Sequence, residues 1–125
     1  PLSPLVPPSP PPPPSNSFTV KSGPCSTSND YCFRSPNYPS SYGVSQQCEI
    51  VVNKGVTISA TTFDVESSAI CAFDYLEVPN VTGGSTRFCG GSALSGPQGM
   101  ATVVGSTILF VSDYSRTFSG FEICG

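Results

Sequence analysis

Residues 56–78 read VTISATTFDVESSAICAFDYLEV, and this stretch decides the fold class. Apolar and polar side chains alternate through Val56–Phe63, and a second apolar segment, Phe73–Val78, follows a short connection. Alternation with a period of two is typical of a β-strand with one buried face. The stretch therefore predicts two strands. The first is expected to place Val56, Ile58, Ala60 and Thr62 on one face and Thr57, Ser59, Thr61 and Phe63 on the other.

Further strands are predicted on both sides of this stretch, because β-branched and aromatic residues are plentiful and favour strands. Glycine-containing turn signals separate them. The expected strands are Phe18–Lys21, Gln47–Asn53, Arg87–Cys89, Ala101–Val104, Thr107–Ser112 and Gly120–Cys124. Short, evenly spaced strands predict an all-β sandwich. The continuously apolar run from Thr107 to Val111 predicts a central strand covered on both faces. Phe18–Lys21 is either a first strand or a strand donated to a neighbouring molecule.

The first fourteen residues, PLSPLVPPSPPPPP, contain nine prolines and cannot build a packed core. Such a sequence favours polyproline II, in which fourteen residues extend about 43 Å. We therefore divide the chain into a Pro-rich stalk at residues 1–17 and a β domain at residues 18–125. The stalk is either a disordered linker or a segment that docks in an aromatic groove, since polyproline II loses little entropy on binding.

Charge and composition argue against several classes of function. Five basic and eight acidic residues give a net charge of −3, whereas nucleic-acid binding needs clustered Lys and Arg. No run of eighteen apolar residues is present, so membrane insertion is not expected. The chain has no histidine, the usual general base and zinc ligand, so an enzyme is not expected. Because it begins at Pro1 without a signal segment, we expect a mature piece of a longer precursor.

The six cysteines indicate disulfides and a secreted, extracellular protein. None of them forms a Cys-x-x-Cys pair, so neither a zinc ribbon nor a redox motif fits. Six cysteines can pair in fifteen ways, and their spacing alone does not choose among these.

The order of several short motifs resembles the CUB domain family. The motifs are Ser35-Pro36-Asn37-Tyr38-Pro39, Tyr42, Cys48 with Ile50 and Val52, Phe63-Asp64-Val65-Glu66, Cys71, Asp74-Tyr75-Leu76-Glu77-Val78, Cys89-Gly90, Ser112-Asp113-Tyr114-Ser115 and Gly120-Phe121. The resemblance implies a sandwich of two antiparallel sheets. Within the β domain, the sequence departs from the family pattern in two ways. Ile50 stands where an aromatic residue is usual, and the chain has two cysteines beyond the usual four. The resemblance also implies the disulfides Cys25–Cys48 and Cys71–Cys89. Cys32 and Cys124 then remain as the third pair.

The resemblance further implies a calcium site at Glu66, Asp74 and Asp113, with Ser115 as a further oxygen ligand and Tyr42 as a supporting residue. Glu66 and Asp74 have the family's spacing of eight residues. Three adjacent carboxylates repel one another, so a cation or a basic residue must lie among them. The alternatives are that the acids are solvated or that Arg116 neutralises them. In the family a Lys or Arg of a partner often contacts such a site, so a basic ligand is implied.

Glycosylation is predicted at two places. Asn80-Val81-Thr82 is an N-glycosylation sequon in a loop flanked by Pro and Gly. The Ser-Pro-Pro tract resembles hydroxyproline-rich matrix proteins of green algae and plants. That resemblance implies hydroxylated and O-glycosylated prolines at Pro10, Pro11, Pro12, Pro13 and Pro14.

Two hypotheses for function follow. In the first, the chain is a structural subunit that links head to tail, through its stalk and the residues Phe18 and Val20, to other copies or other matrix proteins. Contacts of this kind do not close, so they make a fibre or matrix. In the second, the domain is a calcium-dependent binding module for a protein or glycan, held on a Pro-rich spacer. The first hypothesis places the protein in a cell wall, matrix or surface filament.

Overall fold

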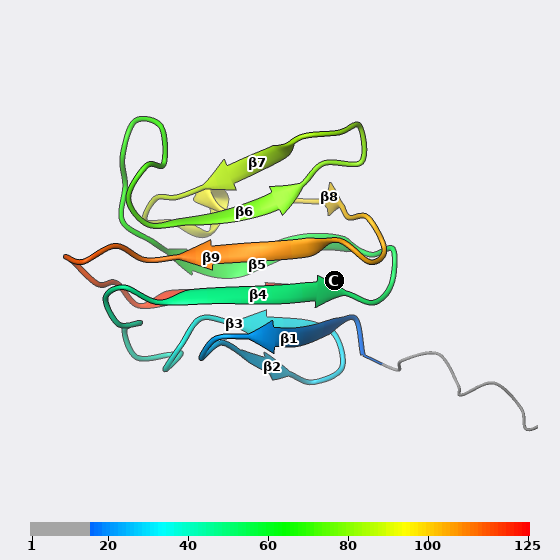
Figure 1. The fold of residues 1–125 in the computed structure, drawn as a ribbon, viewed down its shortest axis with the longest axis horizontal. Helices are drawn as coiled ribbons and strands as arrows, with labels where there is room; N and C mark the ends of the chain where they lie inside the picture. Colours follow the sequence, from blue (N-terminus) through cyan, green and yellow to red (C-terminus); the bar gives the residue numbers. More distant parts are fainter. Residues whose placement is uncertain (1–15) are drawn as a thin grey trace, which may run out of the picture.

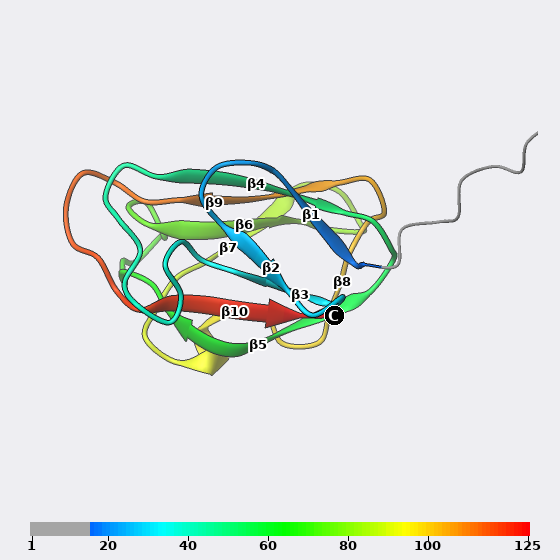
Figure 2. The ribbon, with the colours of Figure 1, turned by 90° about the horizontal axis from the view of Figure 1, so that it is seen from below.

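The computed structural model describes residues 16–125, which form two five-stranded antiparallel sheets packed face to face (Figures 1 and 2). The strands are β1 Phe18–Ser22, β2 Ser26–Ser28, β3 Cys32–Arg34, β4 Gln47–Val52, β5 Thr57–Asp64, β6 Tyr75–Pro79, β7 Ser85–Phe88, β8 Met100–Ala101, β9 Thr107–Val111 and β10 Gly120–Cys124. One 3-10 turn, η1, spans Ala93–Ser95. No helix among these residues is long and apolar enough to cross a membrane. The predicted all-β sandwich is confirmed. Residues 1–15 of the predicted stalk, which include Pro10–Pro14, lie outside the described residues.

The two sheets have the strand orders β1-β4-β9-β6-β7 and β2-β3-β10-β5-β8. Figure 2 shows the layer containing β4 and β9 above the layer containing β10 and β5. The strands β2 and β3 were not predicted, and the strand expected at Ala101–Val104 is reduced to the two residues of β8. Strands this short carry too little alternation to be recognised from the sequence.

The middle strand of the first sheet is β9, as expected, but it is not covered on both faces. Ile108 and Phe110 are fully buried, whereas Thr107, Leu109 and Val111 are only half-buried. The outer face of this sheet is open to solvent, as is common for antiparallel sheets. The prediction that both faces of this strand are buried, which rested on its continuous apolar residues, is therefore wrong for the outer face.

A β-bulge changes the faces predicted for β5. In the pairing with β10, Glu122 lies opposite Thr62 and Ile123 lies opposite Ala60, so Thr61 is the extra residue. The bulge brings Phe63 onto the buried face with Ile58 and Ala60, and it leaves Thr62 exposed. The prediction that Phe63 and Ile58 point to opposite faces is wrong for this reason.

The first strand, β1, pairs within its own domain and is not donated to a neighbouring molecule. It pairs antiparallel with β4, with Phe18 opposite Val52. Phe18 is 1% exposed, and Val20 packs against the core. The Phe18 side chain is therefore buried in its own fold and is not available to a neighbour, whereas Val20 is only half-buried and the assembly contact predicted for it stays a prediction.

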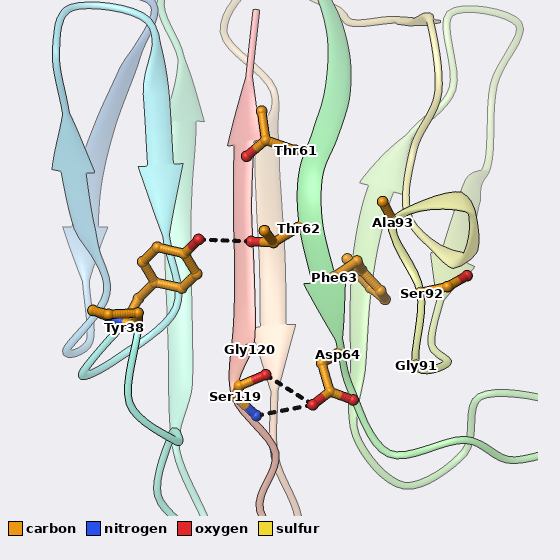
Figure 3. Close-up of a pocket in the computed structure, with 11 residues that line it drawn as sticks. Tyr38, Thr61, Thr62, Phe63, Asp64, Gly91, Ser92, Ala93, Ser119 and Gly120 are labelled. Carbon is orange, nitrogen blue, oxygen red and sulfur yellow. Dashed lines mark hydrogen bonds between the residues drawn. The ribbon is translucent and has the colours of Figure 1, made fainter.

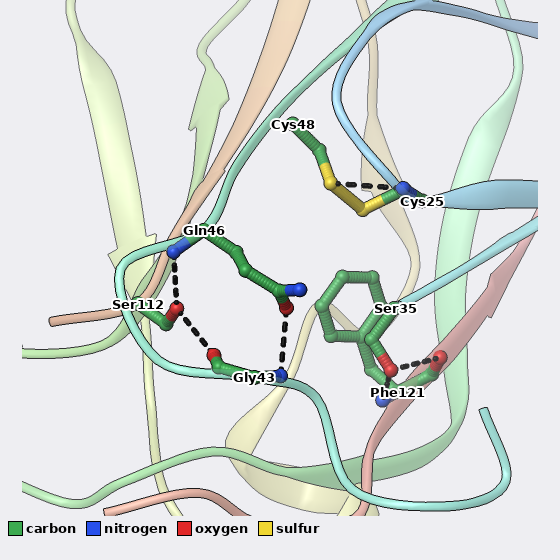
Figure 4. The surroundings of a disulfide bond; sticks show 7 residues. All are labelled: Cys25, Ser35, Gly43, Gln46, Cys48, Ser112 and Phe121. Carbon is green, nitrogen blue, oxygen red and sulfur yellow. Dashed lines mark hydrogen bonds between the residues drawn. A yellow bond between two sulfur atoms is a disulfide. The ribbon is translucent and has the colours of Figure 1, made fainter. Parts of the chain in front are cut away.

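Aromatic rings form the centre of the core. Phe121 lies 5.1 Å from Phe110 and 5.9 Å from Phe33 between ring centroids, and Phe33 lies 4.8 Å from Phe18. Ser35 fixes the backbone of Phe121, because its Oγ accepts a hydrogen bond from the Phe121 N–H at 2.9 Å (Figure 4). Gly120 has a φ of 86°, and a Cβ there would lie 1.9 Å from that Oγ, so only glycine fits.

Three disulfides connect the strands, and they join the pairs that the resemblance implied: Cys25–Cys48, Cys32–Cys124 and Cys71–Cys89. Cys25–Cys48 ties the start of β2 to β4, beside the loop that precedes β4 (Figure 4). Cys32–Cys124 joins neighbouring strands of the second sheet, since Cys32 lies opposite Cys124 in the β3–β10 pairing. Cys71–Cys89 closes the long loop between β5 and β6 against the end of β7.

Candidate functional site

Three acidic side chains meet at one end of the sandwich. Glu66 follows β5, Asp74 precedes β6 and Asp113 follows β9, and these three strand ends lie at the same end of the molecule (Figure 1). One carboxylate oxygen of each residue lies within 4.8 Å of the others. The structure therefore brings together the three acids that the sequence predicted as calcium ligands, which we call the acid cluster.

Asp74 is the most firmly held member of the acid cluster. Its side chain is completely buried. Its Oδ2 accepts a hydrogen bond from the Tyr42 hydroxyl at 2.7 Å, and its Oδ1 accepts one from the Asp113 N–H at 2.8 Å. The same Tyr42 hydroxyl accepts the Glu66 N–H at 3.3 Å. Tyr42 thus contacts two of the three acidic residues, as the predicted supporting residue should.

The loop that precedes β4 carries Tyr42 and is held by hydrogen bonds, most of them to or from backbone groups (Figure 4). The Ser112 hydroxyl donates to the Gly43 carbonyl at 2.7 Å and accepts the Gln46 N–H at 2.9 Å. The Ser45 N–H donates to the carbonyl of Asp113 at 2.7 Å. This network joins the segment before β4 to the segment after β9, so Tyr42 and Asp113 are positioned by the same contacts.

Ser115 lies in the turn that follows Asp113. Its N–H donates to Asp113 Oδ1 at 3.1 Å, which orients that carboxylate. Beside the turn is an open pocket of about 320 Å³. The pocket is lined by Glu66, Ser67, Phe73, Asp113, Tyr114, Ser115 and Arg116. Ser67, Phe73 and Tyr114 were not predicted to line a pocket. Of these, Tyr114 could have been found, because it lies inside the Ser-Asp-Tyr-Ser motif that carries Asp113 and Ser115.

The acid cluster carries unbalanced negative charge. Glu66 is 7% exposed, and its Oε1 has no hydrogen-bond partner among the described residues. Burial, and then the charges of Asp113 and Asp74, raise the pKa of Glu66, while the charge of Arg116 lowers it. Burial also raises the pKa of Asp74 above its usual range, against the opposing effect of the Tyr42 hydrogen bond. Burial thus disfavours the ionised form of both acids, and a cation among them would offset this effect.

Arg116 does not provide that cation through an ion pair. The ion pairs formed within residues 16–125 are Lys21–Glu49, Arg34–Glu122 and Arg87–Glu77. Arg116 lines the pocket and is exposed. Its charge lowers the pKa of Glu66, but no ion pair among the described residues supports the predicted alternative of direct neutralisation.

The raised pKa values predict an unusual pH dependence without metal. Folded protein holds protons on Glu66 and Asp74 at pH values where the unfolded chain has released them. In EDTA, these two groups should therefore lower the free energy of unfolding as pH rises from their ordinary carboxyl pKa through the raised pKa. Replacing Glu66 with Gln should flatten this fall, which urea unfolding from about pH 4 to about pH 8 would measure. Equal slopes for both proteins would contradict the prediction. Glu122, whose pKa is lowered by Thr61 and Arg34, is present in both and cancels in the comparison.

The predicted glycosylation site lies away from the acid cluster. Asn80 begins the turn between β6 and β7, and Val81 and Thr82 beside it are exposed. The Asn80 Nδ2 donates to the Gly83 carbonyl at 3.4 Å, and its Oδ1 accepts the Thr86 hydroxyl at 2.8 Å. The position is accessible, and glycosylation there stays a prediction.

Comparisons with known proteins agree with the geometry. The family model described as CUB domain matches residues 22–124. Among curated proteins, the chain is 33% identical to bone morphogenetic protein 1 of Xenopus laevis, in a match that covers 72% of this chain and 14% of that protein. It is 31% identical to cubilin of Sus scrofa, in a match that covers 70% of this chain and 3% of that protein.

A solved structure shares the arrangement of the strands. The CUB1-EGF-CUB2 domain of human MASP-1/3 is 25% identical, with a TM-score of 0.60 over 86% of this chain and 40% of that chain. A further relative, embryonic protein UVS.2 of Xenopus laevis, is 27% identical over 83% of this chain and 21% of its own length. The chain thus spans about a fifth or less of these curated relatives.

Proposed function

We propose that this chain, which belongs to the CUB domain family, is an extracellular module that binds a protein partner through a calcium ion held by Glu66, Asp74 and Asp113. The family and its relatives are extracellular proteins built with protein-binding modules. The observation that carries the proposal is the Oε1 atom of Glu66, which is buried without a partner among the described residues. A buried carboxylate oxygen in that state is costly unless an ion or a donor satisfies it.

The chemistry of the ligand atoms favours calcium over other metals. Each member of the acid cluster offers a carboxylate oxygen, and oxygen ligands suit calcium. All six cysteines are bonded to one another, so no thiolate is available for zinc. When bound, calcium would supply positive charge to the three carboxylates. Asp74 is held by Tyr42 and Asp113 in one orientation, which would reduce the entropy lost on binding.

A partner with a basic side chain suits the pocket beside the acid cluster. Three carboxylates and one divalent ion leave one net negative charge on the acid cluster itself, and Arg116 on the rim is exposed to solvent. The rim of the pocket carries two exposed aromatic residues, Phe73 and Tyr114, at 52% and 84% exposure. A Lys or Arg from a partner would reach the acids, and its aliphatic stem would contact these rings.

Calcium binding is tested by thermal unfolding in calcium and in EDTA. At free calcium one hundred times the dissociation constant, the ion should stabilise the fold by about 2.7 kcal/mol. Asp74→Asn and Glu66→Gln should abolish this gain, since each removes a ligand charge. Asp30→Asn, a matched change at an exposed aspartate outside the acid cluster, should keep it. An unchanged melting temperature for the unmodified chain in calcium and EDTA would refute the site.

Head-to-tail assembly is a second proposal, and one observation favours it. β1 is an edge strand of the first sheet, with β4 on one side and no strand of the described residues on the other. Open edges pair readily with an added strand. If residues 1–15 bind the edge of a neighbouring copy, light scattering should show large assemblies for the full chain and a monomer for a chain without them. Monomers in both cases would reject assembly and leave the calcium proposal intact.

A further inference from the structure

A second concave surface lies on the outer side of the second sheet (Figure 3). Its volume is about 400 Å³. The floor is formed by Thr61, Thr62, Phe63 and Asp64 of β5 together with Ser119 and Gly120, and the two sides are Tyr38-Pro39 and Gly91-Ser92-Ala93. None of these residues lines the pocket beside the acid cluster. We call it the Tyr38 pocket.

The Tyr38 ring is held in place at one side of the pocket. Its hydroxyl shares a hydrogen bond of 2.8 Å with the Thr62 hydroxyl (Figure 3). The Arg34 guanidinium lies 5.1 Å from the ring centroid. Arg34 itself is bound by Glu122, with two contacts of 2.7 Å to Oε2. The ring is therefore fixed before any ligand binds, and the charges next to it cancel.

Asp64 lies at the end of the pocket, where one of its carboxylate oxygens accepts hydrogen bonds and the other accepts none from the described residues. Its Oδ2 accepts the Ser119 hydroxyl at 2.8 Å and the Ser119 N–H at 3.3 Å (Figure 3). Its Oδ1 receives no hydrogen bond from the described residues. Gly91 lies opposite, and a Cβ at Gly91 would come within 3.5 Å of that Oδ1. The lack of a side chain at Gly91 leaves the open oxygen accessible from the pocket.

We propose that the Tyr38 pocket binds one ring of a neutral saccharide. An aromatic side chain offers apolar contact to the C–H face of a sugar, with its polar tip still solvated. The free oxygen of Asp64 can accept sugar hydroxyls. The exposed hydroxyls of Thr62 and Ser92 can donate or accept, whereas the Ser119 hydroxyl donates to Asp64 and can only accept. The balanced Arg34–Glu122 pair adds no net charge beside the ring, and Asp64 is the one charged residue among the described residues that line the pocket. A small pocket with one apolar side and a few placed polar groups is the usual form of such a site.

The test is NMR titration of the full chain with methyl glycosides of glucose, galactose, mannose and arabinose, in EDTA. We expect at least one of these to shift the amide signals of Thr62, Gly91, Ser92, Ser119 and Gly120, with a dissociation constant on the order of 1 mM. Binding should be equally strong in calcium, because the acid cluster is not part of the Tyr38 pocket. A failure of the calcium proposal would therefore leave this result unchanged.

Matched variants separate the site from general effects. Tyr38→Ala and Asp64→Asn should each weaken binding about tenfold, which is about 1.4 kcal/mol. Tyr31→Ala and Asp30→Asn change the same residue types at exposed positions outside the pocket and should leave affinity unchanged. Gly91→Val keeps every hydrogen bond of Asp64 and should block binding by filling the space before Oδ1.

Two results would overturn the proposal. One is the absence of shifts at the pocket with all four glycosides. The other is a response of the same amides to Nα-acetyl-lysine methyl ester, whose side-chain amine is charged, but not to the glycosides. That result would make Asp64 a site for a basic peptide.

Discussion

Replacing both Cys32 and Cys124 with alanine is expected to lower the free energy of unfolding by about 4–5 kcal/mol. The bridge spans 92 residues of sequence, so it removes much of the freedom of the unfolded chain. It also joins β3 to β10, the pair that attaches the edge of the second sheet to its middle. Guanidinium unfolding followed by circular dichroism, without reductant, measures the loss.

The control for this change is the short bridge. Cys71–Cys89 spans only 18 residues, and its removal by the same double alanine substitution should cost about 3 kcal/mol. A larger loss for the short bridge than for the long one would contradict the account based on chain entropy. It would assign the stabilisation to contacts around Cys71 and Cys89 instead.

Replacing Phe121 with alanine is expected to cost about 3–5 kcal/mol. The ring is completely buried and touches three other rings, with centroid distances of 5.1 Å to Phe110, 5.9 Å to Phe33 and 6.0 Å to Phe63. These residues come from both sheets. The cavity would therefore lie at the contact between the layers, where neither sheet can close it alone.

The matched control is Phe73→Ala, measured in EDTA so that calcium plays no part. Phe73 is 52% exposed and lies outside the core, so its loss should cost less than about 1 kcal/mol. Urea unfolding of both variants gives the comparison. Equal losses at the two positions would show that the Phe121 ring does not pack as the structure has it.

The fold class could be predicted because the longer strands carry their own pattern. Alternation through β4 and β5, and apolar residues in β9 and β10, mark four of the ten strands clearly. The strand β2 could not be found in this way, because its three residues are Ser-Thr-Ser and none is buried. The face of Phe63 was missed because a bulge at Thr61 depends on pairing with β10, which no local pattern encodes.

The acid cluster could be predicted only through the order of motifs. Glu66 and Asp74 are eight residues apart, but Asp113 is a further 39 residues along the chain, and no local pattern brings these three strand ends together. The unpartnered Oε1 of Glu66 could not be predicted at all, because it depends on which side chains pack around it. The Tyr38 pocket was missed for the same reason. Its lining comes from four separated segments that include Tyr38, Thr62, Ser92 and Ser119.

The contact between Ser17 and Gly125 has a mechanical consequence. The Ser17 hydroxyl donates to the Gly125 carbonyl at 3.0 Å, so a pulling force applied at these two residues acts across a short distance. As the chain is stretched, tension passes from Ser17 to Cys32 and then through the bridge to Cys124. Only the segment with β1 and β2 can lengthen, to roughly 50 Å. A chain that lacks this bridge but keeps the other two disulfides could extend to roughly 240 Å. The acid cluster, at the other end of the sandwich (Figure 1), would keep its shape under a load that peels away the first strand.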